Sequence, residues 1–284
     1  MESGSRFIQI KNFSEQKTSE YSRSFSPIMQ PNPRLQELVD PRLVVGLGLE
    51  VQNPLPLTDD SILSEYHAVL TGIETDNNRM GKDFFRKAEV PELFKETVVI
   101  PGVDGNDLSL YITRPETLAN DETGPCVLYI HGGGMGIYSA QGPMYLNISN
   151  DFADTLRCTV VAVEFRNSTG ELGNHPFPAG LHDCRSALEW INAQKCIRNF
   201  SHVIICGESG GANLSIALTL LMKSENKHGC IDGVYVMCPY ISGLYDEKEC
   251  EEAKLLPSLR ACDHCGIVDL KILNAMARVY DPDG

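Results

Sequence analysis

The chain lacks an uncharged apolar run of the length needed to cross a bilayer, which is about 20 residues. The most apolar stretch, residues 203–222, is interrupted by Glu208 and Asn213. Residues 1–7 also lack the apolar segment of a secretory signal peptide. These absences predict a protein without a membrane span, and we expect it to be cytoplasmic.

Basic residues are scarce relative to acidic ones. The 284 residues include 24 Lys and Arg against 38 Asp and Glu, which gives a formal net charge of −14. Because nucleic-acid binding depends on clustered Lys and Arg, this balance argues against a nucleic-acid partner. The length allows one large α/β domain or two smaller ones.

The cysteine spacing of a disulfide framework is also missing. Half of the ten cysteines fall inside or directly beside predicted strands and helices: Cys126, Cys158, Cys184, Cys206 and Cys238. We therefore expect free, mostly buried thiols. Cys262 and Cys265 have the spacing of half a zinc knuckle, but no second pair accompanies them, so coincidence is favoured over a metal site.

No internal repeat or long low-complexity tract divides the chain. Residues 1–28 are polar and predict a loosely ordered arm. Residues 29–94 carry mostly helical spacing of apolar residues, for example at Tyr66 and Leu70. The pattern changes at residue 95, and residues 95–284 form the predicted core.

Within the core, apolar runs alternate with helical patterns. A hairpin is predicted first, around the turn-rich residues 101–107. The strands and helices expected after it are, in chain order, 127–130, 145–156, 160–165, 178–195, 203–206, 210–223 and 234–238. Continuous apolar strands separated by amphipathic helices are typical of a parallel sheet covered on both faces, which binds ligands at the carboxyl ends of its strands.

Two glycine-containing motifs carry the chemistry. Gly207-Glu208-Ser209-Gly210-Gly211 joins a predicted strand to a helix, and its glycines give room for the tight turn that exposes a serine nucleophile. This string alone is a weak signal, since glycine and serine are common in turns. The second string, His131-Gly132-Gly133-Gly134, follows an upstream strand, where such a loop can direct backbone N–H groups at an oxyanion. Together they predict an acyl-transfer site.

With these motifs, and with residues 163–167 running into 175–180, the chain resembles the hormone-sensitive-lipase-like branch of the α/β-hydrolases. The resemblance extends from about residue 95 to the end, and residues 29–94 resemble the N-terminal cap of that branch. It implies an α/β-hydrolase fold with a mostly parallel central sheet, helices on both faces and an N-terminal helical cap.

The resemblance also implies roles for individual residues. Ser209 is then the nucleophile, and His131 with Gly132 supports the glycine loop. The oxyanion hole is formed by backbone N–H groups of three glycines: Gly133, Gly134 and Gly210. The arm through His175 and Phe177 is expected at the same end of the sheet, beside the acyl pocket. The implied partner is a small-molecule ester, and no metal or organic cofactor is needed.

The chain departs from the family in one respect. Members carry the acid and the histidine of the triad after the nucleophile, whereas residues 274–284 still resemble the region before the acid. We therefore expect the chain to stop before both partners and before the last strands of the fold. For Asp183, which precedes the nucleophile, a structural role in hydrogen bonding is preferred over catalysis.

The other histidines are poor substitutes for the missing base. His228 lies at the far end of the helix that begins beside the nucleophile, about 25 Å away at ~1.5 Å per residue. His175 precedes the nucleophile and fits a loop-packing role. His264, with Asp246 and Asp263 upstream, is the best candidate within the chain, although nothing places it at a strand end.

Two hypotheses for function follow. The first is a serine hydrolase of carboxylic esters that works through an acyl-serine intermediate, of which this chain is an incomplete copy. The alternative is a non-catalytic small-molecule-binding protein or an inactive truncated homologue; the plant gibberellin receptor resembles the same branch. The intact serine and glycine loop favour the enzyme, whereas a missing base favours the binder.

The last predicted strand has an unprotected edge if the chain ends at Gly284. Residues 234–238 contain no charge, and the only nearby proline, Pro239, follows the run. Such an edge can pair with another chain. We therefore expect homo-oligomerisation or aggregation through this edge.

Overall fold

The computed structural model describes residues 57–58, 61–84, 92–118, 123–241 and 270–283; the side chains of residues 80–84 and 270 are not described. Its described strands form one six-stranded sheet in the order β1-β2-β4-β3-β5-β6. Their bounds are β1 Leu93–Pro101, β2 Asp107–Pro115, β3 Gly124–Ile130, β4 Thr159–Val163, β5 Phe200–Glu208 and β6 Gly233–Met237. The helices are α3 Leu63–Phe84, α4 Pro143–Leu156, α5 Ala179–Gln194, α6 Gly210–Ser224 and α8 Leu270–Tyr280, with a short 3₁₀ turn η1 at His228–Cys230.

The sheet is mixed. β1 and β2 form the predicted antiparallel hairpin, and β2 pairs antiparallel with β4. β4, β3, β5 and β6 run parallel to one another. The mostly parallel α/β sheet expected from the sequence is therefore confirmed.

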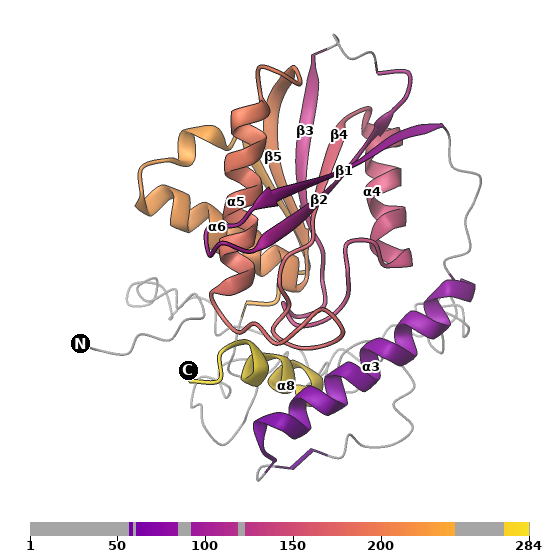
Figure 1. The fold of residues 1–284 in the computed structure, drawn as a ribbon, viewed down its shortest axis with the longest axis vertical. Helices are drawn as coiled ribbons and strands as arrows, with labels where there is room; N and C mark the ends of the chain where they lie inside the picture. The colour runs from indigo at the N-terminus through magenta and orange to yellow at the C-terminus, as the bar shows by residue number, and fades with distance from the viewer. Residues whose placement is uncertain (1–56, 59–60, 85–91, 119–122, 242–269, 284) are drawn as a thin grey trace, which may run out of the picture.

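Helices cover both faces of this sheet (Figure 1). Along β3, Val127 and Tyr129 are buried in the hydrophobic cluster that includes α4, whereas Leu128 and Ile130 are buried with α5 and α6 on the other face. Successive side chains of a strand point to opposite faces, so a wholly apolar strand needs both layers. This is why the central strands read as continuous apolar runs.

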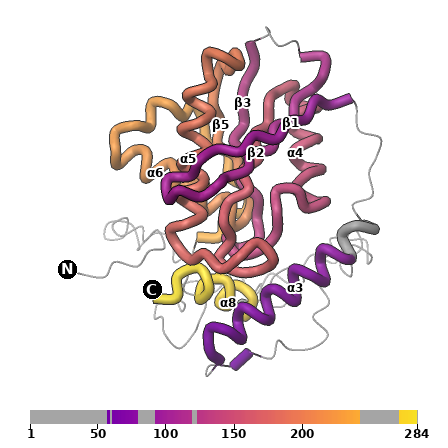
Figure 2. Tube along the Cα trace, viewed as in Figure 1, coloured from indigo at the N-terminus to yellow at the C-terminus, as the bar shows by residue number. Residues whose placement is uncertain are grey.

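The helices α3 and α8 lie side by side below the sheet, against the loops at the carboxyl ends of its strands (Figures 1 and 2). The helix α3 falls inside the predicted cap region 29–94, whereas β1 begins at Leu93, just within it. The predicted arm 1–28 lies outside the described residues. None of the described helices is long and apolar enough to cross a membrane.

Two predicted strands end earlier than expected. β4 stops at Val163, because the ring of Phe165 leaves the sheet to stack on His131 at a centroid distance of 4.3 Å. β6 stops at Met237, so Cys238 is not a strand residue; it is exposed and has a φ of 38°. All seven described cysteines are free, and four of them are buried.

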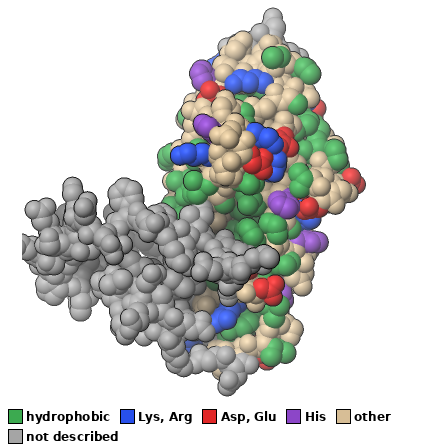
Figure 3. Space-filling model, turned by 90° about the vertical axis from the view of Figure 1, so that its left-hand side faces the viewer, with side chains coloured by type: hydrophobic (Ala, Val, Ile, Leu, Met, Phe, Trp, Pro, Cys, Tyr) green, Lys and Arg blue, Asp and Glu red, His purple; other side chains and the backbone are tan. Residues whose placement is uncertain are grey.

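Within the described part of the chain, β6 pairs with β5 on one side only. Val234 and Tyr235 on this strand are 41% and 58% exposed. Hydrophobic side chains also reach the surface on the side of the molecule that carries α6 (Figure 3). Association through the β6 edge stays a prediction.

Candidate active site

Ser209 lies on a strained turn between β5 and α6. Its φ of 53° and ψ of −114° are rarely adopted by a residue with a Cβ atom. The turn is fixed by its backbone: Ser209 donates its N–H to Met237 O at 2.9 Å, and Tyr240 N donates to Ser209 O at 3.1 Å. The serine itself is only half-buried at this turn.

The glycines beside Ser209 are required by packing. A Cβ at Gly207 would collide with Gly211 O, and a Cβ at Gly211 would collide with Ile130 O. These clashes involve main-chain atoms, which cannot move aside as a side chain can. The turn therefore brings the start of α6 against the end of β3, as the motif predicts.

The glycine loop lies in direct contact with this turn. A Cβ at Gly210 would come within 2.5 Å of Met135 N and 2.7 Å of Gly134 N. Gly133 and Gly134 adopt φ values of 99° and 62°, in the region that favours glycine. No hydrogen bond to another described residue is found for the N–H groups of Gly133, Gly134 or Gly210. Three backbone donors thus remain available beside the strained serine.

His131 holds the glycine loop from inside the protein. It is fully buried, and its Nδ1 donates to Gly132 O at 2.8 Å. Its ring stacks on Phe165, and Nε2 has no hydrogen-bond partner among the described residues, with Glu164 Oε1 at 3.9 Å. Burial lowers the pKa of His131 to about 4, although the bond to Gly132 opposes this. A neutral, enclosed ring supports the loop-holding role rather than proton transfer.

A model of the family described as "alpha/beta hydrolase fold" matches residues 127–282, which include both motifs. The chain belongs to this family. Brefeldin A esterase, described as a bacterial homologue of human hormone-sensitive lipase, is 31% identical, with a TM-score of 0.77; the match covers 89% of this chain and 70% of that structure. This α/β-hydrolase therefore lies in the hormone-sensitive-lipase-like branch.

Curated relatives are also named as esterases. "Probable carboxylesterase 13" of Arabidopsis thaliana is 30% identical over 157 residues, which cover 48% of this chain and 46% of the relative. "Esterase LipI" of Mycobacterium tuberculosis is 27% identical over 213 residues, which cover 74% of this chain and 60% of the relative. The hydrolase chain thus spans less than two thirds of the length of these relatives.

Two polar side chains behind the glycine loop were not predicted. A Cβ at Gly132 would lie 2.8 Å from Tyr145 Oη and 3.0 Å from Glu208 Oε2. Burial raises the pKa values of both groups, and the charge of Glu208 adds to the effect on Tyr145. The position of Glu208 directly before the nucleophile was the only signal for its proximity, and nothing in the sequence signalled Tyr145.

The other side of the loop is covered by α8. A Cβ at Gly134 would collide with the Met276 side chain. Tyr280 accepts a hydrogen bond from Phe177 N at 2.8 Å, and the two rings lie 5.7 Å apart. His175 is exposed, and its N–H donates to Asn167 O. The arm through His175 and Phe177 thus packs on α8, and its place beside an acyl pocket stays a prediction.

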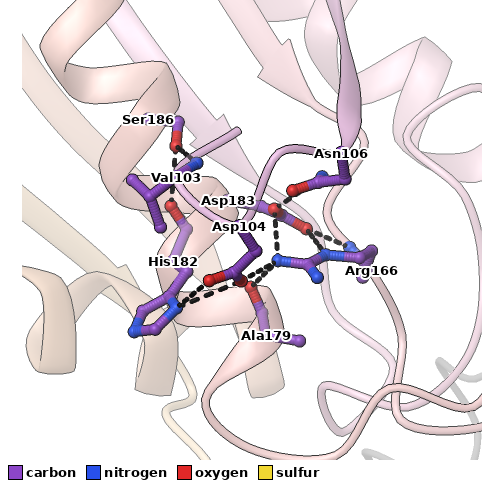
Figure 4. Close-up of polar contacts among 8 residues, drawn as sticks. All are labelled: Val103, Asp104, Asn106, Arg166, Ala179, His182, Asp183 and Ser186. Atoms are coloured by element: carbon purple, nitrogen blue, oxygen red, sulfur yellow. Dashed lines mark hydrogen bonds and ion pairs between the residues drawn. The ribbon is translucent and has the colours of Figure 1, made fainter. Parts of the chain in front are cut away.

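Asp183 has the structural role that the sequence favours (Figure 4). It is fully buried and accepts hydrogen bonds from Arg166 N, Nε and Nη2 at 2.8, 2.9 and 2.9 Å, and from Asn106 Nδ2 at 3.1 Å. Asp104 binds the same guanidinium from the hairpin loop, at 2.6 Å, and also contacts His182. With both carboxylate oxygens occupied, Asp183 ties the segment after β4 and the hairpin turn to α5.

No histidine of the described part forms a hydrogen bond with the Ser209 hydroxyl. His228 lies in η1, beyond the far end of α6. The candidate base His264, the acids Asp246 and Asp263, and the cysteine pair at 262 and 265 lie outside the described residues. Among the residues that are described, no group of three or more His, Cys, Asp or Glu side chains could hold a metal ion.

Proposed function

We propose that this α/β-hydrolase is a serine hydrolase of carboxylic esters, with Ser209 as its nucleophile. The observation that carries the proposal is the contact of Gly210 with the backbone of Gly134 and Met135 beside a serine at a φ of 53°. This contact supports an oxyanion hole formed by the N–H groups of Gly133, Gly134 and Gly210. The names of the esterase relatives support a small-molecule ester as substrate.

In the proposed reaction, a histidine base removes the proton of Ser209 as Oγ attacks the ester carbonyl carbon. The carbonyl oxygen becomes the oxyanion and accepts hydrogen bonds from the glycine N–H groups. The alcohol leaves with the proton, and water then attacks the acyl-serine and releases the acid. His264 is the candidate for the base within this chain.

The first test is turnover of short-chain p-nitrophenyl esters by the protein and by Ser209→Ala. If this chain supplies the base, the substitution should remove at least ~10³-fold of the rate, since loss of a triad nucleophile costs several orders of magnitude; if the base lies outside it, this chain should be nearly inactive and the same loss is expected in a version extended at its C-terminus. Ser224→Ala is the matched control, because Ser224 is an exposed residue at the end of α6. His264→Ala should lose a comparable share of activity if His264 is the base.

The second test is covalent labelling with a fluorophosphonate probe, followed by peptide mass spectrometry. We expect the label on Ser209 and its absence from Ser209→Ala. A label on another serine, or equal turnover by Ser209→Ala and the control, would overturn the proposal. Ester binding that Ser209→Ala retains, without turnover by either protein, would instead favour the non-catalytic binding protein.

A further inference from the structure

The cap helix α3 carries a glutamate whose carboxylate is buried against two loops of the core. Glu74 is only 1% exposed. Its Oε1 accepts a hydrogen bond from Tyr138 N at 2.6 Å, and its Oε2 accepts one from Glu171 N at 2.7 Å. Both of its oxygens therefore satisfy backbone donors of the core.

The first of these donors belongs to the glycine loop. Gly136 N and Ile137 N both donate to Gly133 O, at 3.0 and 3.1 Å, so the loop from Gly133 to Tyr138 is a compact turn. A Cβ at Gly133 would collide with Ile137 O, which shows how closely the turn is wound. Fixing the Tyr138 N–H at the end of this turn therefore restrains Gly133 at its start.

The second donor belongs to a loop that is bonded to the glycine loop. Ser168 N donates to Met135 O and Thr169 N donates to Gly136 O, both at 3.1 Å. Glu171 follows two residues after Thr169. Glu74 thus links the two loops just beyond these backbone hydrogen bonds, because it accepts one bond from each loop.

Neighbouring side chains of α3 contact the same loops. His67 Nδ1 lies 2.8 Å from Thr169 Oγ1, and Asn77 Nδ2 donates to Tyr138 Oη at 2.6 Å. A Cβ at Gly170 would collide with the Glu74 carboxylate. The cap helix therefore docks through a continuous polar contact, with Glu74 at its centre.

Backbone N–H groups, rather than a cation, hold the Glu74 carboxylate. No ion pair links it to a Lys or Arg of the described residues. Burial raises the pKa of this carboxyl, and its two N–H bonds oppose the rise. Removing the carboxylate would leave the Tyr138 and Glu171 N–H groups without their acceptor, at a position where the replaced side chain is only 1% exposed, and a lost partner at such a position is costly.

We propose that Glu74 is a positioning residue that holds the oxyanion loop in its working geometry from the cap. The proposal rests on the proposed function, since it gives the loop a role in stabilising an oxyanion. In this arrangement, the N–H donors of Gly133 and Gly134 reach their working positions only when α3 is docked on the core.

The test compares Glu74→Gln with Asp76→Asn, which removes an exposed carboxylate of the same helix that pairs with exposed Arg79. Hydrogen exchange by mass spectrometry should be at least 10-fold faster in Glu74→Gln for peptides covering 132–140 and 166–173. Peptides of β5 and α6 should match the wild type, and Asp76→Asn should match it throughout. Glu74→Ala should show the larger effect; if it does not fold, Glu74→Gln carries the test.

The second readout is the concentration dependence of fluorophosphonate labelling, measured well below the unfolding temperature. Glu74→Gln should lower the maximal labelling rate about 10-fold and leave the half-saturating probe concentration nearly unchanged. Wild-type exchange in both loops, or faster exchange with an unchanged maximal labelling rate, would overturn the proposal. If the probe labels no serine in the wild type, the proposed function fails, and the exchange comparison alone decides whether Glu74 holds the loop.

Discussion

Acidification should destabilise this α/β-hydrolase-fold protein through His131. The ring is fully buried, its Nδ1–H is committed to Gly132 O, and its pKa is lowered to about 4. In the unfolded chain the same ring titrates near 6.5. As the pH falls below that value, the unfolded state takes up a proton that the folded state does not, so stability is lost between about pH 6.5 and pH 4.

The size of this loss follows from the two pKa values. Proton linkage with 6.5 in the unfolded state and about 4 in the folded state lowers the free energy of unfolding by about 2 kcal/mol at pH 5, relative to pH 7.5. At pH 4 the loss approaches about 3 kcal/mol. Against this, an imidazolium would attract Glu164 Oε1, which lies 3.9 Å from Nε2. The experiment decides which of the two effects prevails.

The assay is urea unfolding at pH 7.5 and pH 5 for the wild type and for His131→Asn. The asparagine amide can still donate to Gly132 O but does not titrate, so its stability should fall by about 2 kcal/mol less than that of the wild type between the two pH values. His202→Asn is the control for an exposed histidine and should run parallel to the wild type. Parallel losses in the wild type and His131→Asn would refute the reasoning and show that the folded protein accommodates the imidazolium beside Glu164.

Two further predictions concern the loop and the sheet edge. Gly210→Ala should reduce labelling of Ser209 at least ~10²-fold, because its Cβ would come within 2.5 Å of Met135 N and displace the N–H donors from the oxyanion. Gly229→Ala, whose Cβ would meet nothing within 4 Å, is the control. Unchanged labelling in Gly210→Ala would contradict the oxyanion geometry. The wild-type chain should elute from size exclusion as a dimer or larger species, and Tyr235→Lys, at a side chain that is 58% exposed on β6, should shift it towards monomer. A monodisperse wild-type monomer would contradict pairing through this edge.

Local pattern was sufficient to predict the elements that carry the motifs. The hairpin, the buried strands and the turn at Ser209 each follow from neighbouring residues, because apolar runs and glycines act within one element. The ends of β4 and β6 did not follow. Phe165 leaves its strand to reach the His131 ring, and the backbone after Met237 bends back to bond Ser209. Both depend on partners far along the chain.

The polar support of the loop could not be predicted for the same reason. Glu74 lies 64 residues from Tyr138 and 97 from Glu171, and it reads as one more charged residue of a helix. Its burial appears only when the cap meets the core. Tyr145 likewise reads as an apolar position of α4, and only the fold places its hydroxyl beside Gly132.

The packing of the nucleophile motif indicates which of its residues would be retained without selection for activity. Gly207, Gly210 and Gly211 are enclosed by carbonyl oxygens and peptide nitrogens, so a second mutation elsewhere cannot make room for a larger side chain. A descendant that had lost all chemistry would still need these glycines to keep the turn packed as it is. Ser209 differs, because its φ of 53° imposes strain on the order of 1–3 kcal/mol that a glycine would relieve. Of the whole motif, the strained serine is thus the position at which relaxed selection for activity would first be visible.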